Sequence, residues 1–131
     1  MTNKKIGYQG IPGAYSEKAA QQFFGDNITL KNHRDFEAVF KSVVNSKVDF
    51  GVIPLENSLA GSRVENYDYL LKHNVWITGE IKLRVKHLLL GLAKSNLANI
   101  KKIKSHPQAL AQCSQTLKSL GKFEMVPYFD T

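Results

Sequence analysis

The chain has 131 residues, with 18 lysines and arginines against 11 aspartates and glutamates, one cysteine and 43% hydrophobic residues. This length suits one domain, and the apolar fraction is too high for an intrinsically disordered chain. One cysteine excludes an internal disulfide and a cysteine-based zinc site, and the absence of long apolar stretches argues against a membrane span or a secretory signal, so we expect a reduced, cytoplasmic setting.

The net charge of +7 is unevenly distributed along the chain. Residues 1–80 hold nine basic and nine acidic side chains, whereas residues 81–131 hold nine basic and only two acidic ones. Such asymmetry usually indicates nucleic acid or an anionic ligand as a partner. Counter-charge in a part of the protein outside this chain would explain it equally well.

The first half of the chain alternates strand and helix patterns. Short apolar runs predict strands over residues 5–9, 28–30 and 50–53. This alternation argues for a parallel α/β sheet with ligands at the carboxyl ends of its strands. Three helices are predicted from apolar spacing, with buried residues Ala19, Ala20, Phe23 and Phe24 in the first, Phe36, Val39, Phe40, Val43 and Val44 in the second, and Val64, Tyr67, Leu70 and Leu71 in the third.

The helix ends carry their own signals. Ser16 is placed as the N-cap of the first helix, Glu17 lies in its first turn and Gly25 at its end. Asp35 is the expected cap of the second helix.

The second half opens with two predicted strands, over residues 75–77 and 81–85. The second of these alternates apolar residues with Lys82, Arg84 and Lys86, which predicts one wet, basic face. A further strand is expected around Ile100 and Ile103, and a last one over residues 123–128. Between them, Pro107 starts a helix that ends at Gly121 and buries Leu110, Cys113, Leu117 and Leu120.

Three polar loops stand at strand-to-helix junctions, over residues 10–16, 56–62 and 105–108. Each combines small residues with hydroxyl or amide groups and precedes a helix N-terminus, where free N–H groups favour an anion. Ordinary caps and turns are the alternative explanation for any one loop alone. Glu56 and Asn57, however, are unusual choices for a plain connection.

These loops resemble those of the prephenate dehydratase family. The resemblance rests on Gly10-Ile11-Pro12-Gly13-Ala14-Tyr15-Ser16-Glu17, on Ile53-Pro54-Leu55-Glu56-Asn57-Ser58 with Gly61, on Ile77-Thr78-Gly79-Glu80, on Ser105-His106-Pro107-Gln108, and on Asp130-Thr131. The motifs occur in the family's order over the whole chain, so the signal is far stronger than a lone glycine loop.

The resemblance implies an α/β fold of two lobes, similar to a type II periplasmic binding protein. Lobe one is expected over residues 1–80, with a hinge near Gly79, and an incomplete lobe two over residues 81–131. The family's catalytic threonine lies in a Thr-Arg-Phe motif that this sequence lacks. We therefore expect an inactive N-terminal fragment, truncated before that threonine.

The resemblance implies decarboxylating dehydration of prephenate to phenylpyruvate, without a metal or organic cofactor. The expected substrate-binding residues are Gly13, Ser16, Asn57, Ser58, Gly61, Ser105 and Gln108. N–H groups after Gly13 would add to the carboxylate site. Glu56 is expected to orient its neighbours, because a carboxylate facing a dianion would repel it.

His106 is the candidate general acid, because histidine in general is the side chain that can exchange a proton near neutral pH, and this one stands beside a predicted helix start. A role as helix cap is the stronger expectation for it. No metal site is predicted from His33, His73 and His87, which have no ligand partners nearby in sequence. Cys113 and Trp76 are expected in the core.

Other functions remain as alternatives. A non-catalytic module that binds small carboxylates would use the same cleft without chemistry, and arogenate dehydratase is a close relative that residues 63–68 resemble. Nucleic-acid binding is disfavoured, because the basic residues alternate with apolar ones and no aromatic stacking pattern appears. No membrane partner is expected, and the oligomeric state stays open, although the family tends to form homodimers.

Overall fold

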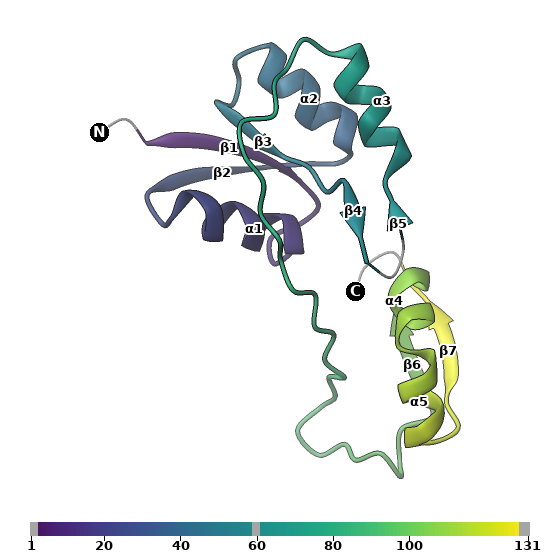
Figure 1. The fold of residues 1–131 in the computed structure, drawn as a ribbon. Coiled ribbons are helices and arrows are strands. Elements are labelled where there is room, and N and C mark those ends of the chain that lie inside the picture. Colours follow the sequence, from purple (N-terminus) through teal and green to yellow (C-terminus); the bar gives the residue numbers. More distant parts are fainter. Residues whose placement is uncertain (1–2, 59–60, 129–131) are drawn as a thin grey trace. The chain divides into compact units, whose positions relative to one another are not determined.

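The computed structural model describes residues 3–58 and 61–128. The chain forms two compact units, a first unit over Met1–Val85 and a second unit over Lys86–Thr131 (Figure 1). Each unit is described by itself.

The first unit is built on a three-stranded parallel sheet. Its strands are β1 (Lys4–Gln9), β2 (Ile28–His33) and β3 (Phe50–Val52), in the order β2-β1-β3. Helix α1 (Tyr15–Phe24) connects β1 to β2, and α2 (Phe36–Val44) connects β2 to β3, on the opposite face of the sheet (Figure 1). The predicted strand–helix alternation is confirmed, and it brings the carboxyl ends of β1 and β3 to one edge.

A pair of glycines lets α2 lie close to the sheet. Gly7 of β1 and Gly51 of β3 are direct partners in the parallel register. A Cβ atom built on Gly7 would lie 3.4 Å from Val39 Cγ1, and one built on Gly51 would lie 2.9 Å from the same atom. Val39 is fully buried, so its methyl groups fill the space that side chains would otherwise take. The buried residues of the first unit also include Ile6, Tyr8, Ala20, Phe40 and Val48.

The start of α1 differs from the prediction. Ser16 is not the N-cap; Ala14 holds that position and makes no side-chain cap bond. Glu17 lies in the first turn as expected, and its carboxylate accepts the N–H of Gly13. The carboxylate thus satisfies a backbone donor just before the helix and ties the glycine loop to the first turn of α1.

The buried face of α1 is also narrower than expected. Ala19 and Ala20 are buried, but Phe23 is 45% exposed. Its ring lies edge-on to Phe24 and against Gly79, whose added Cβ would come within 2.6 Å of it. Phe23 therefore covers a neighbouring segment of chain rather than entering the core.

Asp35 caps α2 as predicted. Its Oδ1 accepts a hydrogen bond from the N–H of Ala38 at 2.8 Å, and its Oδ2 accepts one from the Nε–H of Arg34 at 2.8 Å. The bond from the Ala38 amide is the main reason that the pKa of Asp35 lies below its ordinary value. Helix α2 buries Val39 and Phe40, while Val44 at its end is 46% exposed.

The Asp35 cap predicts a pH-dependent loss of stability. A carboxyl group whose pKa is lowered by folding stabilises the protein above its unfolded pKa and ceases to do so as pH falls through the folded value. We expect Asp35→Ala to be less stable than wild type at pH 7, and this difference to shrink progressively below about pH 4. Urea unfolding at pH 7, 4 and 3 measures it, with Asp26→Ala, at an exposed turn, as the control. A difference that is constant over this range would contradict the assignment.

Helix α3 (Val64–Lys72) exists as predicted but buries another face. Val64 is 66% and Leu71 88% exposed, whereas Asn66 is completely buried. The rings of Tyr69 and His73 each lie 5.6 Å from Phe40 of α2. The helix packs through positions 66, 69, 70 and 73, which lie on one helical stripe. A count of apolar residues did not identify this stripe, because its first and last members, Asn66 and His73, are polar.

The strands predicted over 75–77 and 81–85 are wrong, since no strand occurs among residues 73–101 in the part of the chain that is described. Trp76 is 84% exposed and does not belong to the core. Alternation of apolar and basic residues indicates a strand only where another strand pairs with it, and none does so here.

The second unit contains two parallel strands and two short helices. Strand β6 (Lys102–Ser105) pairs with β7 (Glu124–Pro127), and α4 (Pro107–Gln112) and α5 (Ser114–Leu120) connect them. Pro107 begins the first of these helices and Gly121 ends the second, as predicted, but the single helix expected is broken at Cys113. Ile103 and Leu117 are buried, Cys113 is partly exposed and Leu120 is 42% exposed.

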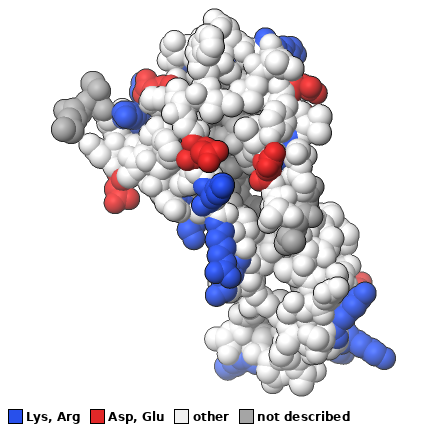
Figure 2. Space-filling model, viewed as in Figure 1, with Lys and Arg blue, Asp and Glu red and all other residues white. Residues whose placement is uncertain are grey.

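The charge asymmetry of the sequence is visible on the surface. Figure 2 shows acidic side chains gathered over the first unit, whereas basic ones predominate over the second. In the second unit, Lys102 is paired with Glu124 at 3.1 Å.

Candidate functional site

Two short strands shape the loop after β3. Strand β4 (Glu56–Asn57) pairs antiparallel with β5 (Gly61–Ser62), so that Asn57 lies opposite Gly61. Gly61 has φ 79°, a left-handed conformation that favours glycine. Ser58 is exposed in the turn and Asn57 is partly buried. The structure thus gathers three predicted site residues in one hairpin, where the sequence indicated only a polar loop.

The glycine loop leaves the same edge of the sheet. Its first glycine, Gly10, donates its N–H to the carbonyl of His33 at 3.0 Å, and Gly13 has φ 95°. The N–H of Gly13 and the hydroxyl of Tyr8 both donate to Glu17 Oε2, the latter at 3.4 Å. Burial, and then the charge of Glu17, raise the pKa of Tyr8.

This geometry changes what the glycine loop offers to a ligand. The Glu17 carboxylate already occupies the N–H of Gly13, and the N–H of Ala14 donates to the carbonyl of Ile11 at 3.1 Å. An incoming carboxylate would have to displace Glu17 or bind beside it. Ser16, partly buried in the first turn of α1, stays next to this position.

The second unit carries the remaining predicted residues at the end of β6. Ser105 is its last residue, and its carbonyl accepts the N–H of Tyr128 at 2.9 Å. His106 caps α4, because its Nδ1 accepts the N–H of Gln108 at 3.2 Å. Ser105 and Gln108 are partly buried and His106 is exposed. The expectation that His106 is a helix cap is confirmed.

Sequence reasoning missed the residues that support the hairpin. Asn66 of α3 donates from Nδ2 to the carbonyl of Pro54 at 2.8 Å, and the hydroxyl of Tyr67 donates to Glu56 Oε1 at 3.2 Å. An asparagine in the first turn of the predicted helix was the available signal, because such a side chain, once buried, must find a hydrogen-bond partner.

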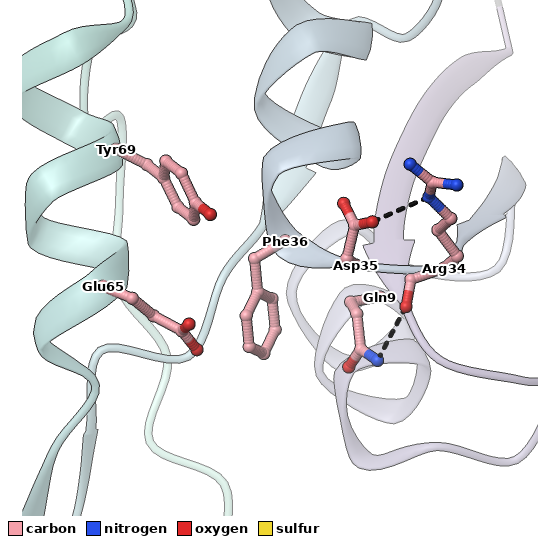
Figure 3. A pocket seen from close by; sticks show the side chains of 6 residues that line it. All are labelled: Gln9, Arg34, Asp35, Phe36, Glu65 and Tyr69. Carbon is pink, nitrogen blue, oxygen red and sulfur yellow. Dashed lines mark hydrogen bonds and ion pairs between the residues drawn. The ribbon is translucent and has the colours of Figure 1, made fainter.

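The first unit also contains a hollow that no predicted site residue lines. It has a volume of about 240 Å³ and lies where β1 and β2 end, between α2 and α3 (Figure 3). Arg34 and Asp35 on its rim are already paired, and the Gln9 amide donates to the carbonyl of Arg34 at 3.4 Å. The polar groups of these three residues thus serve the fold, and we assign no ligand to the hollow. The lining residues are Gln9, Arg34, Asp35, Phe36, Glu65 and Tyr69.

The described part of the chain offers neither a grouped set of metal ligands nor a membrane-spanning helix. Within residues 3–58 and 61–128, no three histidine, cysteine, aspartate or glutamate side chains are grouped to hold a metal ion. No helix in those ranges is long and apolar enough to cross a membrane.

Comparison with known proteins decides the family. The family model described as prephenate dehydratase matches residues 6–131. The chain belongs to the prephenate dehydratase family. Asp130-Thr131, the last of the predicted motifs, falls within this match but lies outside the described residues.

Relatives with curated names include plant enzymes. The chain is 46% identical over 117 residues to "Arogenate dehydratase/prephenate dehydratase 2, chloroplastic" of Arabidopsis thaliana. This match covers 89% of the chain but only 30% of that protein, so the chain spans about three tenths of the relative's length.

Solved structures confirm the fold. The prephenate dehydratase of Staphylococcus aureus superposes with a TM-score of 0.80 at 28% identity, over 95% of this chain and 48% of that one. A structure titled "GqqA- a novel type of quorum quenching acylases" gives 0.82 at 34% identity, over 98% and 46%. The predicted α/β class with type II periplasmic-binding-protein-like architecture is confirmed by these neighbours.

Proposed function

We propose that the full-length gene product containing this chain is a prephenate dehydratase of phenylalanine biosynthesis. The observation that carries this proposal is the family match over residues 6–131, which includes the hairpin of Asn57, Ser58 and Gly61 and the Ser105–Gln108 loop. Both loops follow the carboxyl ends of parallel strands, where ligands of α/β proteins bind.

The reaction sets clear demands on such a site. The ring carboxylate of prephenate leaves as CO2, its bonding electrons enter the ring, and the ring hydroxyl departs with a proton from a general acid as water. The protein must supply that proton and hold the side-chain carboxylate. Amide and hydroxyl donors suit this, because they hydrogen-bond to an anion without bringing a competing charge.

The proposed binding residues follow from this demand. Glu56 has an orienting role, supported by the hydrogen bond that it accepts from Tyr67. No metal or organic cofactor is included in the proposal. The substrate ligands are Gly13, Ser16, Asn57, Ser58, Gly61, Ser105 and Gln108.

We propose further that residues 1–80 form lobe one and residues 81–131 part of lobe two of the dehydratase domain. Partition into two compact units supports this, although the division between the units falls at Val85. A homodimer and a cytoplasmic location complete the proposal; the Arabidopsis relative is named as chloroplastic. The single cysteine suits a reducing compartment.

The general acid role of His106 can be tested against its role as cap. An acceptor at Nδ1 cannot carry a proton there, so the observed bond to Gln108 competes with proton donation from that nitrogen. In the full-length gene product, we expect His106→Asn, which keeps a capping acceptor, to lower kcat for prephenate by less than about tenfold. We expect His106→Ala, which has no capping acceptor, to have a lower melting temperature than His106→Asn. A loss of more than about 100-fold in both variants, with unchanged melting, would instead establish His106 as the acid.

The function itself is tested by incubating the full-length gene product with prephenate and measuring phenylpyruvate. Arogenate, with phenylalanine as product, is the parallel substrate, because the Arabidopsis relative is named for both activities. An N-acyl amide is a third arm, given the acylase title of one structural neighbour. Binding of prephenate without turnover of any substrate would favour the alternative of a non-catalytic carboxylate-binding module.

A further inference from the structure

The start of α3 holds the chain segment that leads into the hairpin. Three consecutive residues of that segment are each bound by a group from the N-terminal part of the helix, two through their carbonyls and one through its side chain. The bonds run from the N–H of Arg63 to the carbonyl of Leu55 at 2.7 Å, from Asn66 Nδ2 to the carbonyl of Pro54 at 2.8 Å, and from the hydroxyl of Tyr67 to Glu56 Oε1 at 3.2 Å.

We call these three hydrogen bonds, and the residues Arg63, Asn66 and Tyr67 that donate them, the clamp. Asn66 is its most deeply buried member. Its exposure is 0%, and its Nδ2 is the nitrogen that faces Pro54, because a carbonyl can only accept. Its Oδ1 is buried without a hydrogen-bond partner among the described residues. A buried oxygen without a hydrogen-bond partner destabilises the folded protein, because it has lost its bonds to water. Burying this amide therefore does little to stabilise α3 itself. What the buried side chain does is hold the Pro54 carbonyl in place.

Tyr67 holds the next part of the segment. Its ring is 39% exposed, so the side chain adds little to the core, yet its hydroxyl reaches the Glu56 carboxylate. Partial burial, and then the bond to Glu56, raise the pKa of Tyr67. The phenol thus stays a donor at neutral pH. Glu56 is the direct chain neighbour of Asn57.

We propose that Asn66 and Tyr67 are positioning residues, which orient the peptides of residues 54–56 and thereby the side chains of Asn57 and Ser58 toward a ligand. This inference rests on the proposed function, since it assigns the clamp to that same site. Because α3 is anchored on α2 through Tyr69 and His73, the clamp ties the hairpin to the folded sheet rather than to another loop.

The decisive variant is Tyr67→Phe, which removes only the hydroxyl. We expect it to raise KM for prephenate about tenfold in the full-length gene product, with kcat changed less than twofold and the melting temperature nearly unchanged. Tyr69→Phe is the matched control, because it removes a hydroxyl two residues along the same helix that is not part of the clamp. Asn66→Ala, where it folds, should raise KM more strongly.

Two substitutions of Glu56 distinguish a positioning role of this residue from a role of its charge in proton transfer. Glu56→Gln keeps an oxygen that accepts the Tyr67 hydroxyl, whereas Glu56→Ala does not. We expect the Gln variant to retain about tenfold more kcat/KM than the Ala variant, and Tyr67→Phe to add nothing to Glu56→Ala. Equal loss in both Glu56 variants would show that Glu56 acts through its charge and would overturn the positioning role.

A second readout needs no substrate. Hydrogen exchange of the Asn57 and Ser58 amides should be faster in Tyr67→Phe than in Tyr69→Phe. Faster exchange in a protein that does not turn over prephenate would reject the proposed function and leave the clamp standing. Unchanged exchange would overturn the clamp, whatever the activity, and faster exchange with unchanged KM in an active enzyme would overturn its positioning role.

Discussion

Asn57→Asp is expected to lower kcat/KM for prephenate by about 100-fold or more in the full-length gene product. The substitution keeps the shape of the side chain but replaces its NH2 donor with an oxygen. Loss of a hydrogen bond to a charged group costs about 1.5–3 kcal/mol, and repulsion between the new carboxylate and a dianionic substrate adds to this cost. Steady-state kinetics with prephenate measure the effect.

A matched control exists on the same unit. Asn27→Asp makes the same charge change at an exposed residue before β2, at the amino end of the sheet, whereas Asn57 follows its carboxyl end. We expect this control to retain wild-type kinetics, and both variants to melt close to wild type. A kcat/KM for Asn57→Asp within twofold of the control would remove Asn57 from the proposed site.

Gly51→Ala is expected to destabilise the protein by about 2 kcal/mol. The new Cβ would lie 2.9 Å from Val39 Cγ1 and 3.2 Å from Val43 Cγ2. Val39 is fully buried and also closes over Gly7, so it has no free space into which to move. Urea denaturation measures the change in free energy of unfolding, and Gly51→Val should exceed it.

Gly79→Ala is the instructive comparison. Its added Cβ would come closer still, 2.6 Å from Phe23 Cζ, but that ring is 45% exposed and can rotate away. We expect a cost below about 1 kcal/mol, because the neighbour yields and the loss of glycine's backbone freedom favours folding. If Gly79→Ala were destabilised as much as Gly51→Ala or more, contact distance rather than the mobility of the neighbour would govern the cost.

Local sequence signals were sufficient for the sheet of the first unit. The strands around Ile6 and Phe50 and the helix capped by Asp35 depend on periodicity, glycine stops and a cap within a few residues, all of which can be read along the chain. The loops of the candidate site were located for the same reason, since each follows a strand.

Features that depend on distant partners could not be predicted. The alternation at residues 81–85 predicts a strand, but pairing decides whether one forms. The face of α3 was misplaced because its stripe begins with Asn66, whose role is visible only once Pro54 lies beside it. The hydrogen bond from the Gly13 N–H to the Glu17 carboxylate was likewise not predicted. A glutamate in the first turn of a helix indicates a favourable charge there, but not which backbone N–H its carboxylate binds.

The charge of the second unit acts on the arrival of a ligand rather than on its final contacts. Seven basic side chains against two acidic ones in residues 86–131 create a positive field that extends about 10 Å into solution at 0.1 M ionic strength. We expect the dianionic substrate that we propose to be drawn toward this unit before it touches any side chain, and its association rate constant to fall as salt is added. For an anionic substrate of the kind proposed, the basic residues need no individual contact with it to matter: their sum sets how often an encounter occurs.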